Sequence, residues 1–238
     1  MKIKLFADGA VISEMLECYE NGIVQGFTTN PTLMKQAGIK DYESFAKEAL
    51  DKIPDAPISF EVFSDEFPEM ERQALKLHKM GENVYVKIPI TNTKKESSIP
   101  LIKKLVEKNV KVNVTAIMTI DQVKGLCRQV LSPEVPSVVS VFAGRIADSF
   151  RNPEPLMKQC RMELNYYKLD HKAELLWAST REVYNIQQAE NCGCEIITVT
   201  PSILNKLKLK EKNLEEYSLE TVKMFYEDAL EAGYKLWL

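Results

Sequence analysis

The chain has 238 residues, of which 45% are hydrophobic and 27% charged, and its net charge is −3 at pH 7. These values are ordinary for a globular protein, and they lack the basic excess of a nucleic-acid-binding protein. The N-terminus lacks the pattern of a signal peptide, and no apolar run approaches the roughly 20 residues of a membrane span. We therefore expect a cytoplasmic protein without a nucleic-acid or membrane partner.

The cysteines and histidines argue against a disulfide framework and against a metal site. The five cysteines are odd in number and lack a CxxC spacing, and there are only two histidines. We therefore expect no protein-bound metal and no other cofactor.

Short β-rich runs alternate with longer amphipathic stretches along the chain. Eight runs have the composition of strands: Lys4–Ala7, Gly26–Thr28, Ile58–Phe63, Val84–Ile88, Val112–Thr115, Val138–Phe142, Glu174–Ala178 and Ile196–Val199. Strands separated by helical segments are typical of βαβ units and a parallel sheet. Eight units favour a closed (β/α)8 barrel, because no GxGxxG turn follows the first strand as in an open dinucleotide-binding sheet.

Helical spacing of apolar residues marks three of the intervening stretches, Glu66–Met80, Ile99–Glu107 and Thr119–Leu131. Thr119, followed by Asp121, is predicted to cap the last of them. Because no linker or composition shift interrupts the chain, we predict one barrel domain over residues 1–238. Its last segment, Ser218–Leu238, is predicted as an additional C-terminal helix that closes the barrel or packs on a neighbouring subunit.

Polar residues recur where the predicted strands end. Active sites of (β/α)8 barrels form at the carboxyl ends of the strands, and buried barrel strands are otherwise nearly all apolar. All eight strands nevertheless carry or lead into polar residues: Asp8, Thr28, Asn30, Ser59, Glu61, Lys87, Asn113, Thr115, Ser140, Arg145, Ser179, Arg181, Thr198 and Thr200. Polar groups at every strand end predict a polar pocket.

Lys87 is the most informative of these residues, because it stands between Val86 and Ile88 in a strand that should be buried. Desolvation favours the neutral amine of a lysine, which can attack a carbonyl and form an imine. The alternative is a lysine whose charge reaches solvent at the strand end or pairs with Glu61. The polar residues at the other strand ends favour the imine.

Two carboxyl groups are candidates for moving protons beside this lysine. Asp8 can serve as the base and acid that C–C bond cleavage in a ketose requires, or it can cap the first helix. Glu61, with Thr115, can hold a water that relays protons during imine formation, or it can form a structural salt bridge. The residues alone leave both alternatives open.

A phosphate cradle is predicted from Arg145, Ser179 and Arg181. An arginine matches phosphate geometry with two parallel donors, and the start of a helix adds backbone N–H groups. Both arginines fall just past strand ends, where such N–H groups point into the pocket. Surface salt bridging is the alternative for each arginine.

Five segments resemble blocks of the transaldolase family, in the family's order: Gly26–Thr32, Val86–Pro89, Asn113–Thr115, Ser140–Ile146 and Ala178–Arg181. The first of them, GFTTNPT, resembles the TTNP signature, and the second, VKIP, resembles the segment that carries the Schiff-base lysine. The resemblance extends from Asp8 to about Thr200. The chain length is similar to the branch of small transaldolases and fructose-6-phosphate aldolases.

The resemblance implies a (β/α)8 barrel, no metal, and imine chemistry on sugar phosphates in a homo-oligomer. By position, Lys87 would form the imine and Asp8 would move protons at the cleaved bond. Glu61 and Thr115 would hold the catalytic water. The remaining roles carried over are the binding of sugar hydroxyls or the intermediate by Thr28, Asn30, Ser59, Asn113 and Ser140, and of the phosphate by Arg145, Ser179 and Arg181.

Glu61 and Phe142 resemble the transaldolase version of the family, because the aldolase branch tends to carry glutamine and tyrosine there. Phenylalanine cannot donate a proton to release the three-carbon enamine. The resemblance therefore implies transfer of a dihydroxyacetone unit from a ketose phosphate to an aldose phosphate. An aldolase that releases dihydroxyacetone and a non-catalytic sugar-phosphate-binding protein are the alternatives. Gly9 and residues 116–118 depart from the family pattern, so the sugars and the pathway, the pentose phosphate pathway or another, stay open.

Overall fold

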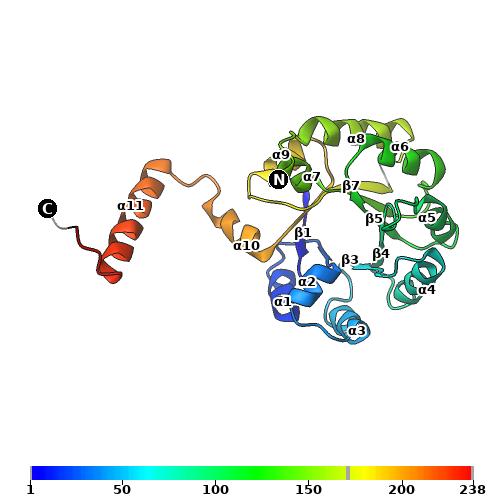
Figure 1. Ribbon diagram of the computed structural model, residues 1–238, viewed down its shortest axis with the longest axis horizontal. Helices are drawn as coiled ribbons and strands as arrows, with labels where there is room; N and C mark the ends of the chain where they lie inside the picture. The colour runs from blue at the N-terminus through cyan, green and yellow to red at the C-terminus, as the bar shows by residue number, and fades with distance from the viewer. Residues whose placement is uncertain (1, 170–171, 237–238) are drawn as a thin grey trace. The chain divides into compact units, whose positions relative to one another are not determined.

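The computed structural model describes residues 2–169 and 172–236. Within this part of the chain eight parallel strands close into a barrel, in which each strand lies beside its sequence neighbours and β1 pairs with β8 (Figure 1). The strands are β1 (Lys4–Asp8), β2 (Gly26–Thr28), β3 (Ile58–Glu61), β4 (Val84–Pro89), β5 (Val112–Ile117), β6 (Ser137–Val141), β7 (Ala173–Trp177) and β8 (Ile196–Val199). The predicted (β/α)8 barrel is confirmed.

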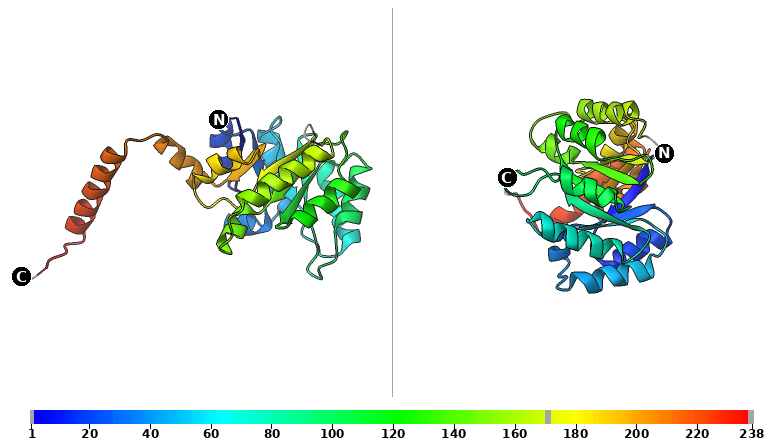
Figure 2. Two further views of the ribbon diagram at one scale, coloured as in Figure 1. Left: turned by 90° about the horizontal axis from the view of Figure 1, so that it is seen from above. Right: turned by 90° about the vertical axis from the view of Figure 1, so that its right-hand side faces the viewer.

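Helices follow each strand along the chain and surround the ring of strands, as two further views also show (Figure 2). They are α1 (Ile12–Glu20), α2 (Pro31–Gln36), α3 (Tyr42–Lys52), α4 (Phe67–His78), α5 (Ile99–Val106), α6 (Ile120–Gln129), α7 (Ala143–Asp148), α8 (Glu154–Tyr166), α9 (Asn185–Asn191) and α10 (Pro201–Leu204). The predicted cap is confirmed, because the Thr119 hydroxyl accepts a hydrogen bond from the Gln122 N–H and the Gln122 side chain accepts one from the Thr119 N–H.

Alternate residues of each strand point into the barrel, and an apolar cluster fills part of the interior. The cluster consists of Phe6, Val138, Leu176, Ala178 and Ile196, with Tyr85 and Phe142 packed against it. Gly26 of the neighbouring strand β2 makes room for the Phe6 ring, because a Cβ atom at Gly26 would lie 2.5 Å from that ring. The packing of this layer therefore requires glycine at position 26.

An irregularity in β5 lies next to a predicted site residue. Val114 pairs with Val139 of β6, but Ile117 pairs with Val141, so that β5 contains one extra residue. Ala116 has a φ of 60°, in the left-handed region that non-glycine residues rarely occupy. Such bulges re-aim neighbouring side chains and recur beside active sites. This one adjoins Thr115.

The chain divides into two compact units, Met1–Leu204 and Asn205–Leu238. The second contains a short 3-10 helix, Asn205–Leu209, and the helix α11 (Leu214–Glu231). The prediction of one domain over residues 1–238 stays a prediction. In the described ranges, no helix has both the length and the apolar character needed to cross a membrane.

The predicted additional C-terminal helix is confirmed, but the bounds predicted for it, Ser218–Leu238, are wrong. The helix begins four residues earlier, because the Asn213 side chain accepts hydrogen bonds from the first N–H groups of the helix and caps it. It ends at Glu231, two residues before Gly233, which has a φ of +66°. The predicted end, Leu238, lies outside the described residues.

Candidate active site

A cavity of about 570 Å³ opens at the carboxyl ends of the strands. It is lined by most of the residues predicted from the sequence: Asp8, Thr28, Asn30, Glu61, Lys87, Thr115, Ser140, Phe142, Arg145, Ser179 and Arg181. The remaining two, Ser59 and Asn113, are buried behind Ser140, to which they are linked by hydrogen bonds. Among the described residues, no three His, Cys, Asp or Glu side chains are grouped so that they could hold a metal ion.

Lys87 is buried at the wall of this cavity, with 6% of its surface exposed. Its Nζ atom lies 3.2 Å from Oε2 of Glu61 and donates a hydrogen bond of 3.1 Å to the carbonyl oxygen of Thr29. The strand register places Glu61 directly beside Lys87. Burial raises the pKa of Glu61, while the nearby Lys87 acts to lower it. The ion pair that the sequence left open is present, and its carboxylate is a ready acceptor for a proton.

Asp8 lies at the end of β1, and its carboxylate accepts a hydrogen bond of 2.7 Å from the Thr28 hydroxyl. Burial raises the pKa of Asp8, and the opposing effects of the Lys87 charge and the Thr28 hydrogen bond are smaller. The alternative role of Asp8 as a helix cap is wrong, because α1 begins after Val11 and has no side-chain cap. Asp8 is therefore a half-buried carboxyl group that faces the same cavity as Lys87.

Three buried polar side chains form a chain of hydrogen bonds across β3, β5 and β6. The Asn113 amide donates to the Ser59 hydroxyl at 3.0 Å, and the Ser140 hydroxyl donates to the Asn113 carbonyl oxygen at 2.6 Å. Each bond satisfies a group that would be costly to bury alone. The chain fixes the Ser140 hydroxyl at the cavity wall, where it can meet a polar ligand.

Thr115 presents a buried hydroxyl oxygen that has no hydrogen-bond partner among the described residues. Its strand position is beside Pro89, two residues beyond Lys87, and next to the bulge in β5. A buried polar atom without a partner is a natural place for a bound water or a ligand hydroxyl. Asn30 differs, because its side-chain oxygen accepts from the Leu33 N–H and caps α2, while the residue still lines the cavity.

The predicted phosphate residues lie together at one side of the cavity. The carbonyl of Ser179 approaches α7 so closely that a Cβ atom at Gly144 would lie 1.6 Å from its oxygen. Ser179 has a φ of 63°, and Arg145 lies with its guanidinium carbon 5.8 Å from the centre of the Phe142 ring. This close packing brings helix α7, which carries Arg145, beside the loop after β7, which carries Arg181.

The two arginines of this region differ in their partners. The guanidinium of Arg181 binds both carboxylate oxygens of Asp148, with Nε distances of 3.0 and 3.1 Å. This contact lowers the pKa of Asp148. Arg145 has no ion pair within the described ranges. The surface salt bridge that the sequence left open is therefore present for Arg181 but not for Arg145.

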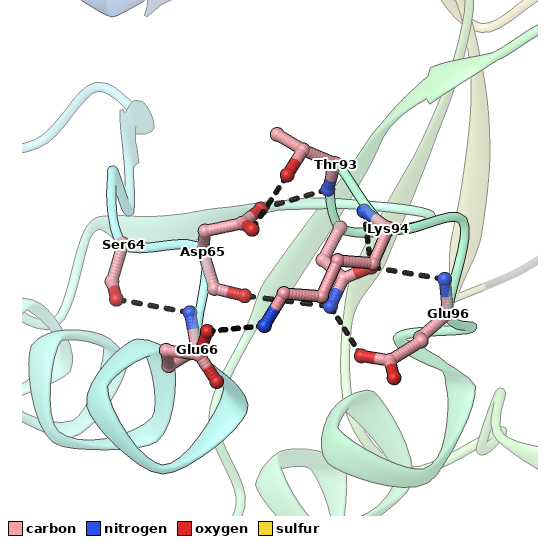
Figure 3. A network of polar contacts seen from close by, with 7 residues as sticks. Ser64, Asp65, Glu66, Thr93, Lys94 and Glu96 are labelled. Carbon is pink, nitrogen blue, oxygen red and sulfur yellow. Dashed lines mark hydrogen bonds and ion pairs between the residues drawn. The ribbon is translucent and has the colours of Figure 1, made fainter.

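The loops that follow β3 and β4 are joined by the polar network of Figure 3. Asp65 accepts hydrogen bonds from the Thr93 N–H at 2.7 Å and from the Thr93 hydroxyl at 2.6 Å, and Lys94 lies 2.6 Å from Glu66. The two loops begin at the strands that carry the lysine and glutamate of the buried ion pair. The network therefore ties together the segments that leave the reactive end of the barrel.

The profile of the transaldolase/fructose-6-phosphate aldolase family matches residues 5–236. The chain belongs to this family. It is 33% identical over 216 residues to a probable transaldolase of Thermoplasma volcanium, covering 90% of this chain and 91% of that protein. It is 34% identical over 218 residues to the probable transaldolase 2 of Listeria monocytogenes, covering 90% and 94%. The resemblance inferred from the sequence blocks is confirmed.

Two solved structures of other proteins share the fold of this family member. KGPDC from Streptococcus mutans superposes with a TM-score of 0.57 at 10% identity, covering 85% of this chain and 90% of that one. The 3-hexulose-6-phosphate synthase of Salmonella typhimurium superposes with a TM-score of 0.57 at 14% identity, covering 86% and 91%. At such low identity the likeness shows the barrel alone.

Sequence reasoning missed several residues that shape the site of this transaldolase-family protein. Thr198 was noted at a strand end but given no role, although its hydroxyl lies 2.5 Å from that of Thr28. Tyr42 donates a hydrogen bond to the backbone carbonyl of Glu61. Asp148 holds Arg181. Thr198 could have been assigned to the site from the sequence, because it is a polar residue at the end of a predicted strand. Tyr42 and Asp148 lie on helices, and their sequence positions do not indicate that they contact site residues.

Proposed function

We propose that the protein is a transaldolase-type transferase that moves a dihydroxyacetone unit from a ketose phosphate to an aldose phosphate through an imine on Lys87. One observation carries the proposal: the buried amine of Lys87, with Glu61 at 3.2 Å, faces a cavity that also contains Asp8 and Thr115. Membership of the family supports the reaction class. The proposal of transfer to an acceptor, instead of release of free dihydroxyacetone, rests on Phe142.

Imine formation requires a neutral amine and the removal of water from the addition product. In the proposed step Lys87 passes a proton to Glu61, whose raised pKa suits it to hold one, and then attacks the ketose carbonyl. A water held by Glu61 and the unpartnered hydroxyl of Thr115 relays protons as the carbonyl oxygen leaves. The ketose is thereby joined to Lys87 as an iminium ion.

Cleavage then requires a base for the hydroxyl proton of the carbon that becomes an aldehyde. Asp8, a half-buried carboxyl group facing the same cavity, is proposed to take this proton as the C–C bond breaks. The electron pair of that bond stays on the three-carbon enamine bound to Lys87. The bound enamine attacks an aldose acceptor, Asp8 returns the proton, and hydrolysis frees Lys87.

The Phe142 ring lines the cavity and is packed against the apolar cluster of the barrel. A phenyl ring has no proton to give, so this side chain cannot protonate the enamine and release dihydroxyacetone. The enamine would then persist until an acceptor arrives. Phe142→Tyr is expected to increase the release of free dihydroxyacetone in the absence of an acceptor. Equal release by the two proteins would remove the argument from Phe142.

Borohydride trapping tests the nucleophile. Incubation with a ketose phosphate and borohydride should leave one covalent adduct on Lys87, detected by mass spectrometry of peptides. Lys87→Ala should lose the adduct, whereas Lys111→Ala, at a half-buried lysine that does not line the cavity, serves as the matched control and should keep it. Undiminished trapping in Lys87→Ala would refute the assignment. If substrate binds tightly and no adduct forms in the wild type, the protein is a binding protein.

The phosphate is proposed to lie between Arg145, Ser179 and Arg181. Arg181→Ala should mainly raise KM for phosphorylated donors, because binding to the phosphate is shared by the ground and transition states. An unchanged KM would exclude this role for Arg181. A panel of donors and acceptors, read by the mass of the trapped adduct, identifies the sugars.

A homo-oligomer is proposed for the working enzyme. None of the described residues of α11 is buried, and its exposed apolar residues include Leu219, Val222, Tyr226 and Leu230, which follow helical spacing. Most of the stability of a helix in a protein comes from packing of its apolar face, so a second copy of the chain is the proposed partner. Light scattering should give a multiple of 27.2 kDa, and Val222→Asp should reduce the mass. A monomeric wild type would refute the proposal.

The compartment is proposed to be the reducing cytoplasm. All five cysteines are free thiols, and four of them are buried. Disulfides are characteristic of oxidising compartments, so free thiols are consistent with a cytoplasmic enzyme.

A further inference from the structure

Three side-chain oxygen atoms from the adjacent strands β1, β2 and β8 are linked in a line at the mouth of the barrel. The carboxylate of Asp8 accepts from the Thr28 hydroxyl at 2.7 Å, and the Thr28 hydroxyl lies 2.5 Å from the hydroxyl of Thr198. Thr28 and Thr198 are 2% and 6% exposed, so water competes little for these hydrogen bonds. Thr198 is therefore a buried partner of the Thr28 hydroxyl, which in turn contacts Asp8, and the mechanism above gives Thr198 no part.

The number of hydroxyl protons determines which group donates in the Asp8–Thr28 and Thr28–Thr198 hydrogen bonds. A threonine hydroxyl has one proton to donate. When Asp8 is a carboxylate, Thr28 uses its proton for Asp8, and the short contact with Thr198 can be a hydrogen bond only if Thr198 donates. The Thr198 hydroxyl thus polarises the Thr28 hydroxyl towards the carboxylate. If Asp8 is protonated and donates to Thr28, the order of donors along the line can reverse.

The backbone around Thr198 holds its hydroxyl in this position. Thr198 pairs with Phe6 in the register of β1 and β8, and the Thr180 hydroxyl donates a hydrogen bond of 2.7 Å to the Thr198 carbonyl oxygen. The charged groups that act on Asp8 from other strands are Lys87 of β4 and Glu61 of β3. Neither of them contacts Thr198 through a hydrogen bond within the described ranges.

We propose that Thr198 is a positioning residue for the reaction, whose hydroxyl donates to Thr28 and so keeps Asp8 a carboxylate ready to accept the substrate proton. The inference rests on the proposed function, because it needs Asp8 to act as a base during cleavage. The mechanism above uses no residue of β8, so this inference gives that strand a part in proton transfer.

The test compares Thr198→Val, which keeps the shape and removes the hydroxyl, with Thr198→Ser, which keeps the hydroxyl. The rate kcat/KM of ketose phosphate cleavage is measured across pH with a coupled assay of the aldose product. In Thr198→Val the acidic limb should move upward by less than about 0.5 pH unit, because the Thr28 hydroxyl loses the donor that polarises it towards the carboxylate. Its kcat near pH 7 should fall up to about tenfold. Thr198→Ser should keep the wild-type profile.

Two measurements separate the possible failures. Borohydride trapping on Lys87 in all three proteins reports the proposed function itself, and circular dichroism reports folding. A wild type that forms no adduct overturns both proposals. If the adduct forms but Thr198→Val keeps the wild-type acidic limb, or if Thr198→Ser is as impaired as Thr198→Val, only the role of the Thr198 hydroxyl is overturned.

Discussion

The two ends of the barrel interior are built from the same strands but differ in chemistry. Towards the amino-terminal end the interior side chains are apolar or aromatic, and two residues later on the same strand they are polar. The pairs are Phe6 and Asp8, Tyr85 and Lys87, Val138 and Ser140, and Ile196 and Thr198. Because residues two apart share one face of a strand, each strand contributes one layer to stability and the next to the site.

The difference teaches that the two layers affect folding in opposite directions. Phe6, Val138 and Ile196 are nearly inaccessible to water, and their burial stabilises the fold. At the mouth, burial raises the pKa values of Asp8 and Glu61, which means that folding disfavours their charged forms. Substitutions in the two layers should therefore have opposite consequences for activity and stability.

The largest effect is expected from removing the buried ion pair as a unit. Lys87→Met with Glu61→Gln should abolish adduct formation and transfer, because no amine remains to form the imine. The melting temperature should stay the same or rise, since neutral replacement of a buried pair is often neutral or stabilising by about 1–4 kcal/mol. Calorimetry measures the melting temperature, and the trapping assay measures adduct formation. Loss of cooperative unfolding in this double variant would show that the ion pair is needed for the fold.

The opposite result is expected at the apolar layer. Phe6→Ala should lower the free energy of unfolding by about 3–5 kcal/mol, because it leaves a cavity beside Gly26 and Ile196. Urea unfolding measures this loss. At a temperature where the variant is still folded, borohydride should trap the adduct on Lys87 as in the wild type. Loss of trapping in the folded variant would mean that the two layers are not separable.

Asp8→Asn should stabilise the protein at neutral pH and abolish efficient cleavage. Folding raises the pKa of Asp8 above its ordinary 3.8, so between these two values the folded state binds more protons than the unfolded state. Stability therefore falls as pH rises through this window, and the full penalty is present above it. Replacing the carboxyl by an amide removes the penalty. A gain of 1 kcal/mol would raise the melting temperature by about 2–4 °C for a chain of this size.

The pH dependence and a control distinguish this effect from a general one. The gain in Asp8→Asn should shrink as pH falls towards 3.8, where the wild-type carboxyl is already neutral. Asp65→Asn is the matched control, because hydrogen bonds from Thr93 lower the pKa of Asp65, and its substitution should not stabilise. A gain of equal size in both variants, or at all pH values, would contradict the explanation.

The barrel and the gathering of the site could be predicted from the sequence for one physical reason. In a parallel barrel all strand ends meet at one face, so residues as distant as Asp8 and Lys87 need no further information to be placed together. The family blocks then gave these residues roles. The bounds of the last helix were missed, because aromatic residues beyond Glu231 suggested a continuing helix while the capping by Asn213 was overlooked.

The partners of the predicted residues could not be read from the sequence. Which hydroxyl faces Asp8 depends on the side-chain directions of β2 and β8, and the pairing of Arg181 depends on how α7 packs beside the loop after β7. The bulge at Ala116 also has no local signal, because its positive φ is set by the pairing with β6. These features arise from tertiary packing and not from local propensity.

The smallest effect is expected at the edge of the mouth, where Asp148 holds the Arg181 guanidinium. Both side chains are about half exposed, so water and salt screen the pair. Asp148→Asn should raise KM for a phosphorylated donor by at most about fivefold and leave kcat unchanged, because Arg181 loses the contact that orients it. A donor without phosphate is the control and should show no change. A lower KM would mean instead that Asp148 competes with the substrate phosphate for Arg181. The charge of Asp148 would then oppose substrate binding, just as burial opposes the charged forms of Asp8 and Glu61.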